Sequence, residues 1–317
     1  MKLRHVGQLF FGMATFIPGV YNLRSKKNGS GGSFSARYCY SVYLRHMVMS
    51  HQRKLSTRPS VVAELGPGDS LGIGLMALLL GSDKYYALDV VKFASPEKNL
   101  KILDELIILL TNQEDIPNDV EFPRIQPKLN SYDFPHEIFP KEYLRKCLSK
   151  SRLLAIKDSV KKSNNMVEYK APWINNININ RNSVDMLISQ AVLEHVDDLD
   201  RAYSVMYEWL KLDGYMSHCI DFKSHGKSDY WDGHWKIPNW YWFLLRGNRP
   251  YLLNRSPFYI HQDIMRKNNF KISFIRRVVS QPTFDRSKLN REFRLMPEED
   301  RSTSGVFIHA EKNIKTT

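Results

Sequence analysis

A glycine-rich turn between two apolar segments constrains the fold of this chain more than any other feature of its sequence. Residues 61–65 read Val-Val-Ala-Glu-Leu, and the turn that follows reads Gly66-Pro67-Gly68-Asp69-Ser70-Leu71-Gly72. A short apolar run closed by glycines predicts a buried strand, and the pattern from about 70 to 80 predicts a helix with Gly81 as its C-cap. This order of strand, glycine turn and helix is the unit that binds nucleotides in parallel α/β proteins.

The rest of the chain continues to alternate between strand and helix patterns. Helices are expected at 38–52, from the fourth strand through 210, and at 261–268, with a turn at 211–214. Further strands are expected at 85–90, 166–169, 184–189, 215–220, 271–279 and 305–310. The alternation predicts an α/β fold with a mostly parallel sheet, and we expect the last two strands to pair as an antiparallel hairpin at its edge.

Two segments lie outside this alternation. About seventy-five residues separate the second and third strands, far more than a crossover helix requires, so we interpret residues 92–165 as a helical insertion that prolines divide into short pieces. Residues 1–55 are expected to form an N-terminal helical cap or lid, and 56–317 the main domain. Within the cap, the Gly- and Ser-rich segment 25–35 reads as a flexible segment that could act as a lid hinge.

The apolar run at 6–20 superficially resembles a signal peptide, but no small-residue cleavage site follows it. Gly7, Gln8, Gly12 and Pro18 interrupt the run, and it is too short to span a bilayer as a helix. We interpret it as a cap segment or substrate-access helix, with peripheral membrane contact as the alternative.

The composition points to a cytoplasmic protein with a basic surface. Cys39, Cys147 and Cys219 lie far apart and leave an odd count for disulfide pairing, which fits a reducing compartment. The formal net charge is +13, but the basic residues are scattered. A solvated basic surface explains this charge, and an acidic, phosphorylated or membrane-proximal partner is the alternative.

The chemistry of the glycine turn favours S-adenosylmethionine (SAM) over a dinucleotide. The glycines follow the spacing G-x-G-x-x-x-G, one residue longer than the dinucleotide fingerprint, and Glu64 and Asp69 flank them. Two carboxylates would repel a pyrophosphate, whereas they attract the ammonium and sulfonium of SAM. Asp69 or Ser70 could instead serve only as the helix N-cap. Asp89 ends the second strand twenty-three residues after Gly66, where an acid can accept hydrogen bonds from both ribose hydroxyls.

These segments resemble the class I SAM-dependent methyltransferases. The resemblance rests on Glu64-Leu65-Gly66-Pro67-Gly68, on Asp89, and on the stretch 183–196, and it covers residues 61–221. It implies a Rossmann-like seven-stranded sheet with helices on both faces, an antiparallel last strand, and SAM across the carboxyl ends of the first, second and fourth strands. The turn Lys211-Leu212-Asp213-Gly214 corresponds to the family's Lys-Pro-Gly-Gly turn and keeps its last glycine.

The resemblance also implies the residues that hold the cofactor. The expected cofactor-binding residues are Glu64, Gly66, Pro67, Gly68, Asp69, Asp89, Trp173 and Gln190. By the same analogy Trp173 would lie beside the adenine, although a plain core tryptophan is the alternative.

Methylation of a hydroxyl also requires a group that removes its proton, and histidine is the natural base. Candidates are His195 after the fourth strand and His218, His225 and His234 around the fifth. We expect His225, Asp221 and His195 to be catalytic, while packing is the default for His218 within its strand.

The loop 220–235 and the segment 221–260 are expected to bind the acceptor. In the loop, Trp231 and Trp235 could stack on a sugar, and the alternative is an aromatic satellite core. Glu194 and His195 are similar to a metal-holding pair in ubiquinone-pathway O-methyltransferases. Because the first acid of that site is Ala191 here, we expect no metal, and a structural or cofactor-shaping role for His195 is the alternative.

The sequence therefore predicts a SAM-dependent O-methyltransferase that acts on a small molecule or a glycan. A nucleic-acid methyltransferase is a lower-ranked alternative, because neither an Asn-Pro-Pro-aromatic motif nor a Pro-Cys pair is present. A catalytically silent SAM-fold interaction module is the alternative from a different class. The Gly spacing and Glu64 argue against a dehydrogenase, and the oligomeric state is left open.

Overall fold

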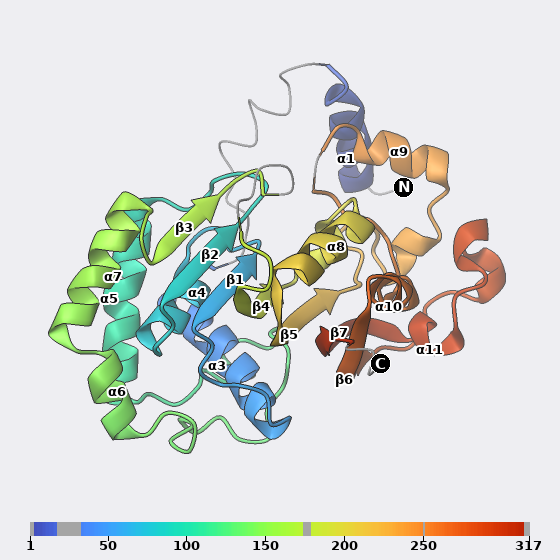
Figure 1. Ribbon diagram of the computed structural model, residues 1–317. Helices are drawn as coiled ribbons and strands as arrows, with labels where there is room; N and C mark the ends of the chain where they lie inside the picture. The colour runs from blue at the N-terminus through green and yellow to red at the C-terminus, as the bar shows by residue number, and fades with distance from the viewer. Residues whose placement is uncertain (1–2, 18–32, 174–178, 250, 314–317) are drawn as a thin grey trace.

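A twisted seven-stranded sheet covered by helices on both faces forms the body of the molecule (Figure 1). The computed structural model describes residues 3–17, 33–173, 179–249 and 251–313. The strands in these residues are β1 (Val61–Leu65), β2 (Lys84–Leu88), β3 (Val167–Lys170), β4 (Val184–Gln190), β5 (Leu210–Asp221), β6 (Phe270–Val279) and β7 (Thr303–Lys312).

The strand order is β3-β2-β1-β4-β5-β7-β6. Strands β1 to β5 pair in parallel, and β7 runs antiparallel to both of its neighbours, β5 and β6. The predicted fold class is therefore confirmed, including the antiparallel last strand. The last two strands pair with each other as predicted. At that side of the sheet β6 is the edge strand, and β7 lies inside the sheet because it pairs with both β5 and β6.

The strand bounds follow the apolar runs closely. The structure places β1 at the predicted residues, whereas β2 ends at Leu88, so that Asp89 lies one residue beyond the strand rather than at its end. The predicted turn at 211–214 lies within β5. There the pairing with β4 moves from Val184 opposite Leu210 to Met186 opposite Tyr215, so the extra residues of β5 bulge out of the ladder.

One face of the sheet is covered by helices from the first half of the chain. These helices are α3 (Ala36–Gln52), α4 (Gly72–Leu79), α5 (Pro96–Asn112), α6 (Lys141–Cys147) and α7 (Lys150–Lys162). Their buried side chains form one apolar cluster with Val62 of β1 and Tyr85 of β2. Helix α3 is buried along most of its length, and the helices of the insertion contribute Leu106 and Ile156 to the same cluster.

The other face is covered by α8 (Leu199–Trp209) and α10 (Phe258–Lys267). Their apolar residues pack with Ala63 and Leu65, which alternate with Val62 along β1 and therefore point to the opposite side. The remaining helical elements are α1 (Leu3–Ala14), α9 (Asn239–Arg246), α11 (Glu298–Arg301), and the short 3₁₀ turns η1 (Leu193–His195), η2 (Gly233–Trp235), η3 (Arg286–Lys288) and η4 (Arg291–Phe293).

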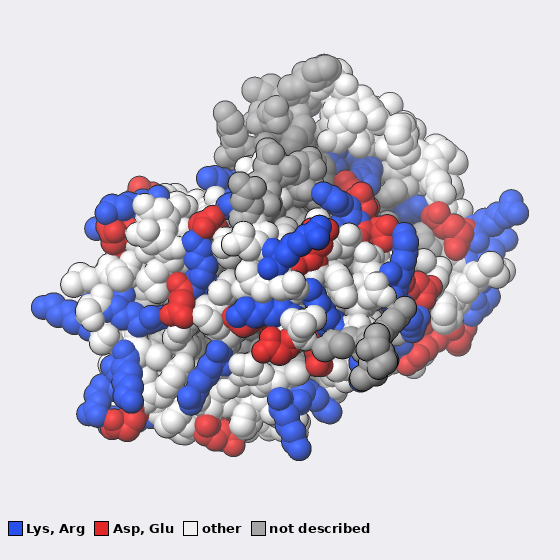
Figure 2. Space-filling view, viewed as in Figure 1, with Lys and Arg blue, Asp and Glu red and all other residues white. Residues whose placement is uncertain are grey.

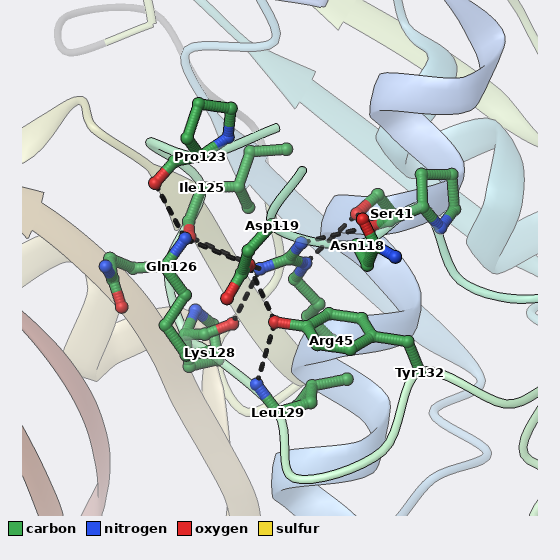
Figure 3. A network of polar contacts seen from close by, with 12 residues as sticks. Ser41, Arg45, Asn118, Asp119, Pro123, Ile125, Gln126, Lys128, Leu129 and Tyr132 are labelled. Carbon is green, nitrogen blue, oxygen red and sulfur yellow. Dashed lines mark hydrogen bonds and ion pairs between the residues drawn. The ribbon is translucent and has the colours of Figure 1, made fainter. Parts of the chain in front are cut away.

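A buried arginine joins the irregular part of the insertion to α3 (Figure 3). The Arg45 side chain is fully buried, and its guanidinium donates to Asp119 and to the backbone oxygens of Pro117, Ile125 and Pro127, at 3.0 to 3.3 Å. The backbone between α5 and α6 is irregular, so several of its carbonyl oxygens lack a partner in a helix or a sheet. The Arg45 guanidinium, which is planar and has five N–H donors, bonds to three of them.

At the N-terminus, α1 packs against α9 above the sheet (Figure 1). Within the described residues, every helix is too short or too polar to cross a membrane. The three cysteines are buried and free. The apolar run predicted at 6–20 is described as far as Ile17, and the hinge predicted at 25–35 lies outside the described residues except for its last three. The boundaries predicted for the cap, the insertion and the acceptor-binding segment stay predictions.

Candidate active site

A cavity of about 570 Å³ opens at the carboxyl ends of β1, β2 and β4. This is the edge of a parallel sheet at which ligands bind, and the volume suits a ligand of nucleoside size. Its lining residues are Gly66, Gly68, Leu88, Asp89, Val90, Phe93, Pro172, Trp173, Gln190, Ala191, Val192, His195, Val196, Asp197, Asp198, His225 and Tyr251.

The glycine turn forms the floor of this cavity in a conformation that only glycine adopts easily. Gly66 and Gly68 have φ angles of 63° and 72°. A Cβ atom on Gly66 would lie 2.6 Å from a methyl carbon of Val192, so the turn after β1 and the segment after β4 are in close contact. Both glycines line the cavity, so the backbone of the turn can approach a bound nucleoside closely.

Asp89 stands beside the turn and is held by backbone groups. Its carboxylate accepts hydrogen bonds from the N–H groups of Gly68, at 3.2 Å, and Val90, at 2.7 Å. Burial raises the pKa of Asp89 to about 6, and these two N–H groups limit the rise. The position predicted for the ribose ligand thus faces the cavity, with its carboxylate fixed in place.

Glu64 lies below the turn and does not line the cavity. Its carboxylate accepts a hydrogen bond from the hydroxyl of Tyr85 in β2, at 2.5 Å. Burial raises the pKa of Glu64 to about 8, so the group is largely neutral at pH 7. Glu64 therefore joins β1 to β2 beneath the turn, and its attraction for a cofactor cation is weaker than the sequence argument assumed.

The other two predicted turn residues, Pro67 and Asp69, also lie outside the lining. The Ser33 hydroxyl donates to the backbone oxygen of Pro67 and, at 2.7 Å, to that of Ser70, which fastens the segment before α3 to the turn. The N-cap residue of α4 is Leu71 rather than Asp69 or Ser70, although the Ser70 hydroxyl accepts from the N–H of Gly72 at 3.2 Å.

Trp173 and Gln190 both line the cavity. Trp173 is buried, and its backbone N–H donates to the backbone oxygen of Asp89 at 3.0 Å. Its ring packs edge-on against that of Trp209, with 6.1 Å between the ring centroids. The side-chain oxygen of Gln190 lies 3.2 Å from a ring nitrogen of His46 in α3. Both residues thus combine a core contact with exposure to the cavity.

Three residues predicted to be catalytic meet at one end of the cavity. Asp221 is the last residue of β5, and His225 Nε2 lies 3.4 Å from its Oδ2. The rings of His195 and His225 pack at a centroid distance of 5.0 Å. His225 has a φ angle of 44°, a strained conformation for a residue with a side chain and one that is common at functional sites.

The electrostatics of this group differ from residue to residue. Burial alone would raise the pKa of Asp221, but the His225 hydrogen bond and the Lys223 charge outweigh it and lower the pKa to about 2. Burial, with the charge of His225, lowers the pKa of His195 to about 4. Asp221 is therefore ionised and His195 neutral at pH 7.

Glu194 lies behind these histidines. It is buried, burial raises its pKa well above the usual range, and neither carboxylate oxygen has a hydrogen-bond partner among the described residues. Ligand atoms of Glu194, His195 and His225 lie within 4.8 Å of one another. The sequence does not indicate this cluster, because His225 lies thirty residues after His195. Because Glu194 is neutral in this environment, it needs no metal ion to balance its charge. The expectation of no metal stays a prediction.

The other candidates in the loop after β5 lie in the core. His218 is buried within β5 and its Nδ1 lies 2.7 Å from the Ser189 hydroxyl, as its default packing role predicts. His234 and Trp235 are buried, and the Trp235 ring nitrogen donates to the Arg255 backbone oxygen at 2.9 Å. Trp231 donates to Gln281 at 2.9 Å. The aromatic satellite core is thus the observed arrangement, which leaves no free face of Trp235 for a sugar.

Val192, Phe93 and Tyr251 are among the lining residues that the sequence did not predict. Val192 meets Gly66, and Phe93 and Tyr251 pack edge-on at 6.3 Å across the cavity wall. Phe93 follows Asp89 by four residues, so its place in the loop after β2 was a usable signal. Tyr251 lies thirty residues beyond the end of β5, and no local pattern marks it.

A family model described as a methyltransferase domain matches residues 136–217, which include β3, β4, α8 and most of β5. This match covers the strand whose carboxyl end carries Gln190 and His195. The matched segment is that of a methyltransferase domain, in agreement with the resemblance to the class I SAM-dependent methyltransferases. SAM, the cofactor that this resemblance implies, would lie between the glycine turn, Asp89 and Gln190.

The methyltransferase also resembles many solved structures at low similarity. A SAM-dependent methyltransferase from Mesorhizobium loti is 11% identical with a TM-score of 0.44, and the match covers 84% of this chain and 98% of that one. One from Methanosarcina mazei is 13% identical with a TM-score of 0.42 and the same coverage. Geranyl diphosphate C-methyltransferase from Streptomyces coelicolor A3(2) is 10% identical with a TM-score of 0.44, over 85% and 78%. At identities and TM-scores this low, the acceptor of a solved methyltransferase says nothing about the acceptor of this chain. No curated protein matches the sequence.

Proposed function

We propose that this methyltransferase transfers the methyl group to a hydroxyl of a small molecule or a glycan, with His225 as the base. The observation that carries the proposal is the contact of His225 with Asp221, because His225 lines the cavity and Asp221 lies behind it at 3.4 Å. A hydroxyl placed beside His225 can lose its proton to the ring as it reacts, a step that a thiolate acceptor would not require.

The side chains divide the work by their charge. Asp221 stays ionised and holds Nε2 of His225, so Nδ1 is the ring nitrogen that remains to accept the acceptor's proton. His195 is too weak a base for this step, because its pKa is about 4, and it positions the acceptor as a neutral hydrogen-bonding group. Bound SAM supplies the activated methyl group.

Labelled SAM tests this proposal against panels of glycans, nucleotide sugars and hydroxylated metabolites. With an accepted substrate, His225→Ala should lower kcat by about 10²–10⁴-fold, the usual contribution of a general base, and leave the SAM Kd within about twofold. His225→Gln should fail to restore turnover, because an amide cannot take the proton.

Two outcomes would contradict this assignment. One is an equal loss of SAM affinity in the His225 variants, measured by calorimetry, and the other is a wild-type protein that methylates only amines or carbon. The same assay after treatment with a chelator tests the expectation of no metal. Turnover that requires an added divalent ion would assign Glu194, His195 and His225 to that ion.

A further inference from the structure

Two neighbouring helices of the methyltransferase carry a contiguous apolar surface. Phe10 of α1 and Ile17, three residues beyond the end of α1, are 65% and 62% exposed, and Trp240 and Phe243 of α9 are 67% and 62% exposed. Phe16 links the two helices, because its ring lies 5.2 Å from that of Phe243. We name this surface the aromatic face, which consists of Phe10, Met13, Phe16, Ile17, Trp240 and Phe243.

Helix α1 is apolar on both of its sides. Its inner side meets α9 so closely that a Cβ atom on Gly12 would lie 2.2 Å from the backbone oxygen of Leu245. Its outer side exposes an apolar stripe of Phe10 and Met13, which the turn after the helix continues with Ile17. A surface helix usually presents a polar stripe to water, so this stripe marks a contact surface.

The aromatic face lies in two stretches of the chain that contain Lys and Arg but no Asp or Glu. Residues 1–63 contain ten Lys and Arg and no Asp or Glu, and residues 233–262 contain four and none. Because the whole chain has a formal net charge of +13, the remaining residues together carry one negative charge. In Figure 2 the surface over α1 and α9 is mostly white and therefore uncharged, while blue and red side chains are mixed over the rest of the visible face.

Some of these basic groups have partners within the protein, and others do not. Arg246 pairs with Asp197, and Arg37 pairs with Glu121. In the described part of the chain, Arg249 bonds only to backbone oxygens at the end of α9, and its guanidinium lies 5.4 Å from the ring of Phe11. An arginine without an acidic partner among the described residues, next to two helices that expose apolar side chains, is complementary to an anionic surface with an apolar interior.

We propose that the aromatic face docks this methyltransferase on the surface of a lipid bilayer that carries anionic headgroups. Trp and Phe at the rim of an apolar patch, flanked by Lys and Arg, are the residues of interfacial helices. With twelve and eight residues, α1 and α9 would lie along the interface rather than span it. A second copy of the chain would bring the two basic stretches together, which disfavours self-association through this face.

The docked helix would also contact the active-site loop. The side-chain amide of Gln8 in α1 donates to the backbone oxygen of Gly226 at 3.2 Å, next to His225. Membrane contact through α1 would therefore hold the loop that lines the acceptor end of the cavity. This docking does not depend on which atom is methylated, so its test needs no turnover.

Vesicle co-sedimentation of the full chain tests the proposal. We expect binding to phosphatidylcholine vesicles with about 30% phosphatidylglycerol, much weaker binding to pure phosphatidylcholine, and loss of binding with added salt. Phe10→Ser and Trp240→Ser should each weaken binding about tenfold, and the double variant about a hundredfold. Val120→Ser and Leu295→Ser are matched controls, because these side chains are 91% and 89% exposed elsewhere, and they should bind as wild type does.

Calorimetry with SAM shows that each variant is folded, since these residues lie outside the cavity. The proposal is overturned if wild type does not bind the anionic vesicles, or if the aromatic-face variants bind as well as the controls. It is also overturned if light scattering finds a wild-type dimer that Trp240→Ser converts to a monomer while vesicles bind neither protein. That result would assign the face to a second copy.

Discussion

Among single residues, Asp89 connects burial directly to cofactor affinity. Only its ionised form can accept hydrogen bonds from ribose hydroxyls while it holds the N–H of Gly68. Because burial raises its pKa to about 6, the protonated fraction grows as the pH falls through 6. We therefore expect the SAM Kd, measured by calorimetry, to be constant near pH 7.5 and to rise toward tenfold per pH unit below about pH 6.

Asp89→Asn provides the control for this prediction. The amide cannot ionise, so binding should be about 10–100-fold weaker at pH 7.5 and nearly independent of pH down to 5. A variant that kept the wild-type pH profile would move the effect to another group, such as His195 or Glu64.

Gly66 is constrained by its backbone and by its neighbour. In Gly66→Ala, the left-handed conformation costs about 1–2 kcal/mol, and the new methyl group meets the Val192 side chain. We expect a free energy of unfolding at least about 2 kcal/mol lower in urea titrations, and SAM affinity at least about tenfold weaker. Gly7→Ala, which has open space around it in α1, should be neutral or slightly stabilising.

Among the elements, the loop between α5 and α6 depends on α3 through Arg45 (Figure 3). Arg45→Ala would remove a charged donor from Asp119 and from three backbone oxygens, of which those of Ile125 and Pro127 have no other donor among the described residues, so we expect a loss of about 3 kcal/mol in the free energy of unfolding. Arg37→Ala is the matched control on the same helix, because its ion pair with Glu121 is exposed and contributes at most about 1 kcal/mol. Equal effects of the two variants would refute the role of burial.

Elements whose pattern is strictly local were predicted well. The apolar run of β1 and the helix patterns of α4 and α10 required no knowledge of their neighbours. The predictions differed where pairing decides the geometry. Residues 211–214 bulge within β5 because β4 fixes the ladder on both sides, and β6 becomes the edge because β7 pairs with β5. Neither the bulge in β5 nor the edge position of β6 can be predicted from a window of ten residues, because both depend on the pairing of strands that are distant in sequence.

For the whole molecule, buried histidines determine the stability in acid. Burial lowers the pKa of six of the ten histidines to about 3 or 4: His46, His195, His218, His234, His261 and His309. The unfolded chain binds protons at these residues below about pH 6.5 and the folded chain does not, so they reduce stability as the pH falls. Glu64, Glu194 and Asp89 act in the opposite direction, because burial raises their pKa.

The histidines outnumber the carboxyls, so unfolding near pH 5 takes up about three protons. The free energy of unfolding should then fall by about 4 kcal/mol per pH unit between pH 6 and 5, with a maximum near pH 7. Urea midpoints at pH 5, 6, 7 and 8 measure this dependence. A midpoint that is the same at pH 7 and pH 5 would show that these histidines are not buried in the neutral form.

The sequence by itself determined the α/β class and the glycine turn after β1 with its acid at 89, because each depends on neighbouring residues or on the spacing within one βα unit. It also named Asp221, His195 and His225 as candidates, and their catalytic role stays a prediction. Only the tertiary structure decided which of these residues face the cavity. It turned Glu64 toward Tyr85, brought Val192 and Tyr251 to the lining, and placed α1 against α9. Such contacts join residues far apart in the chain, and their free energy depends on shape and burial that no local pattern encodes.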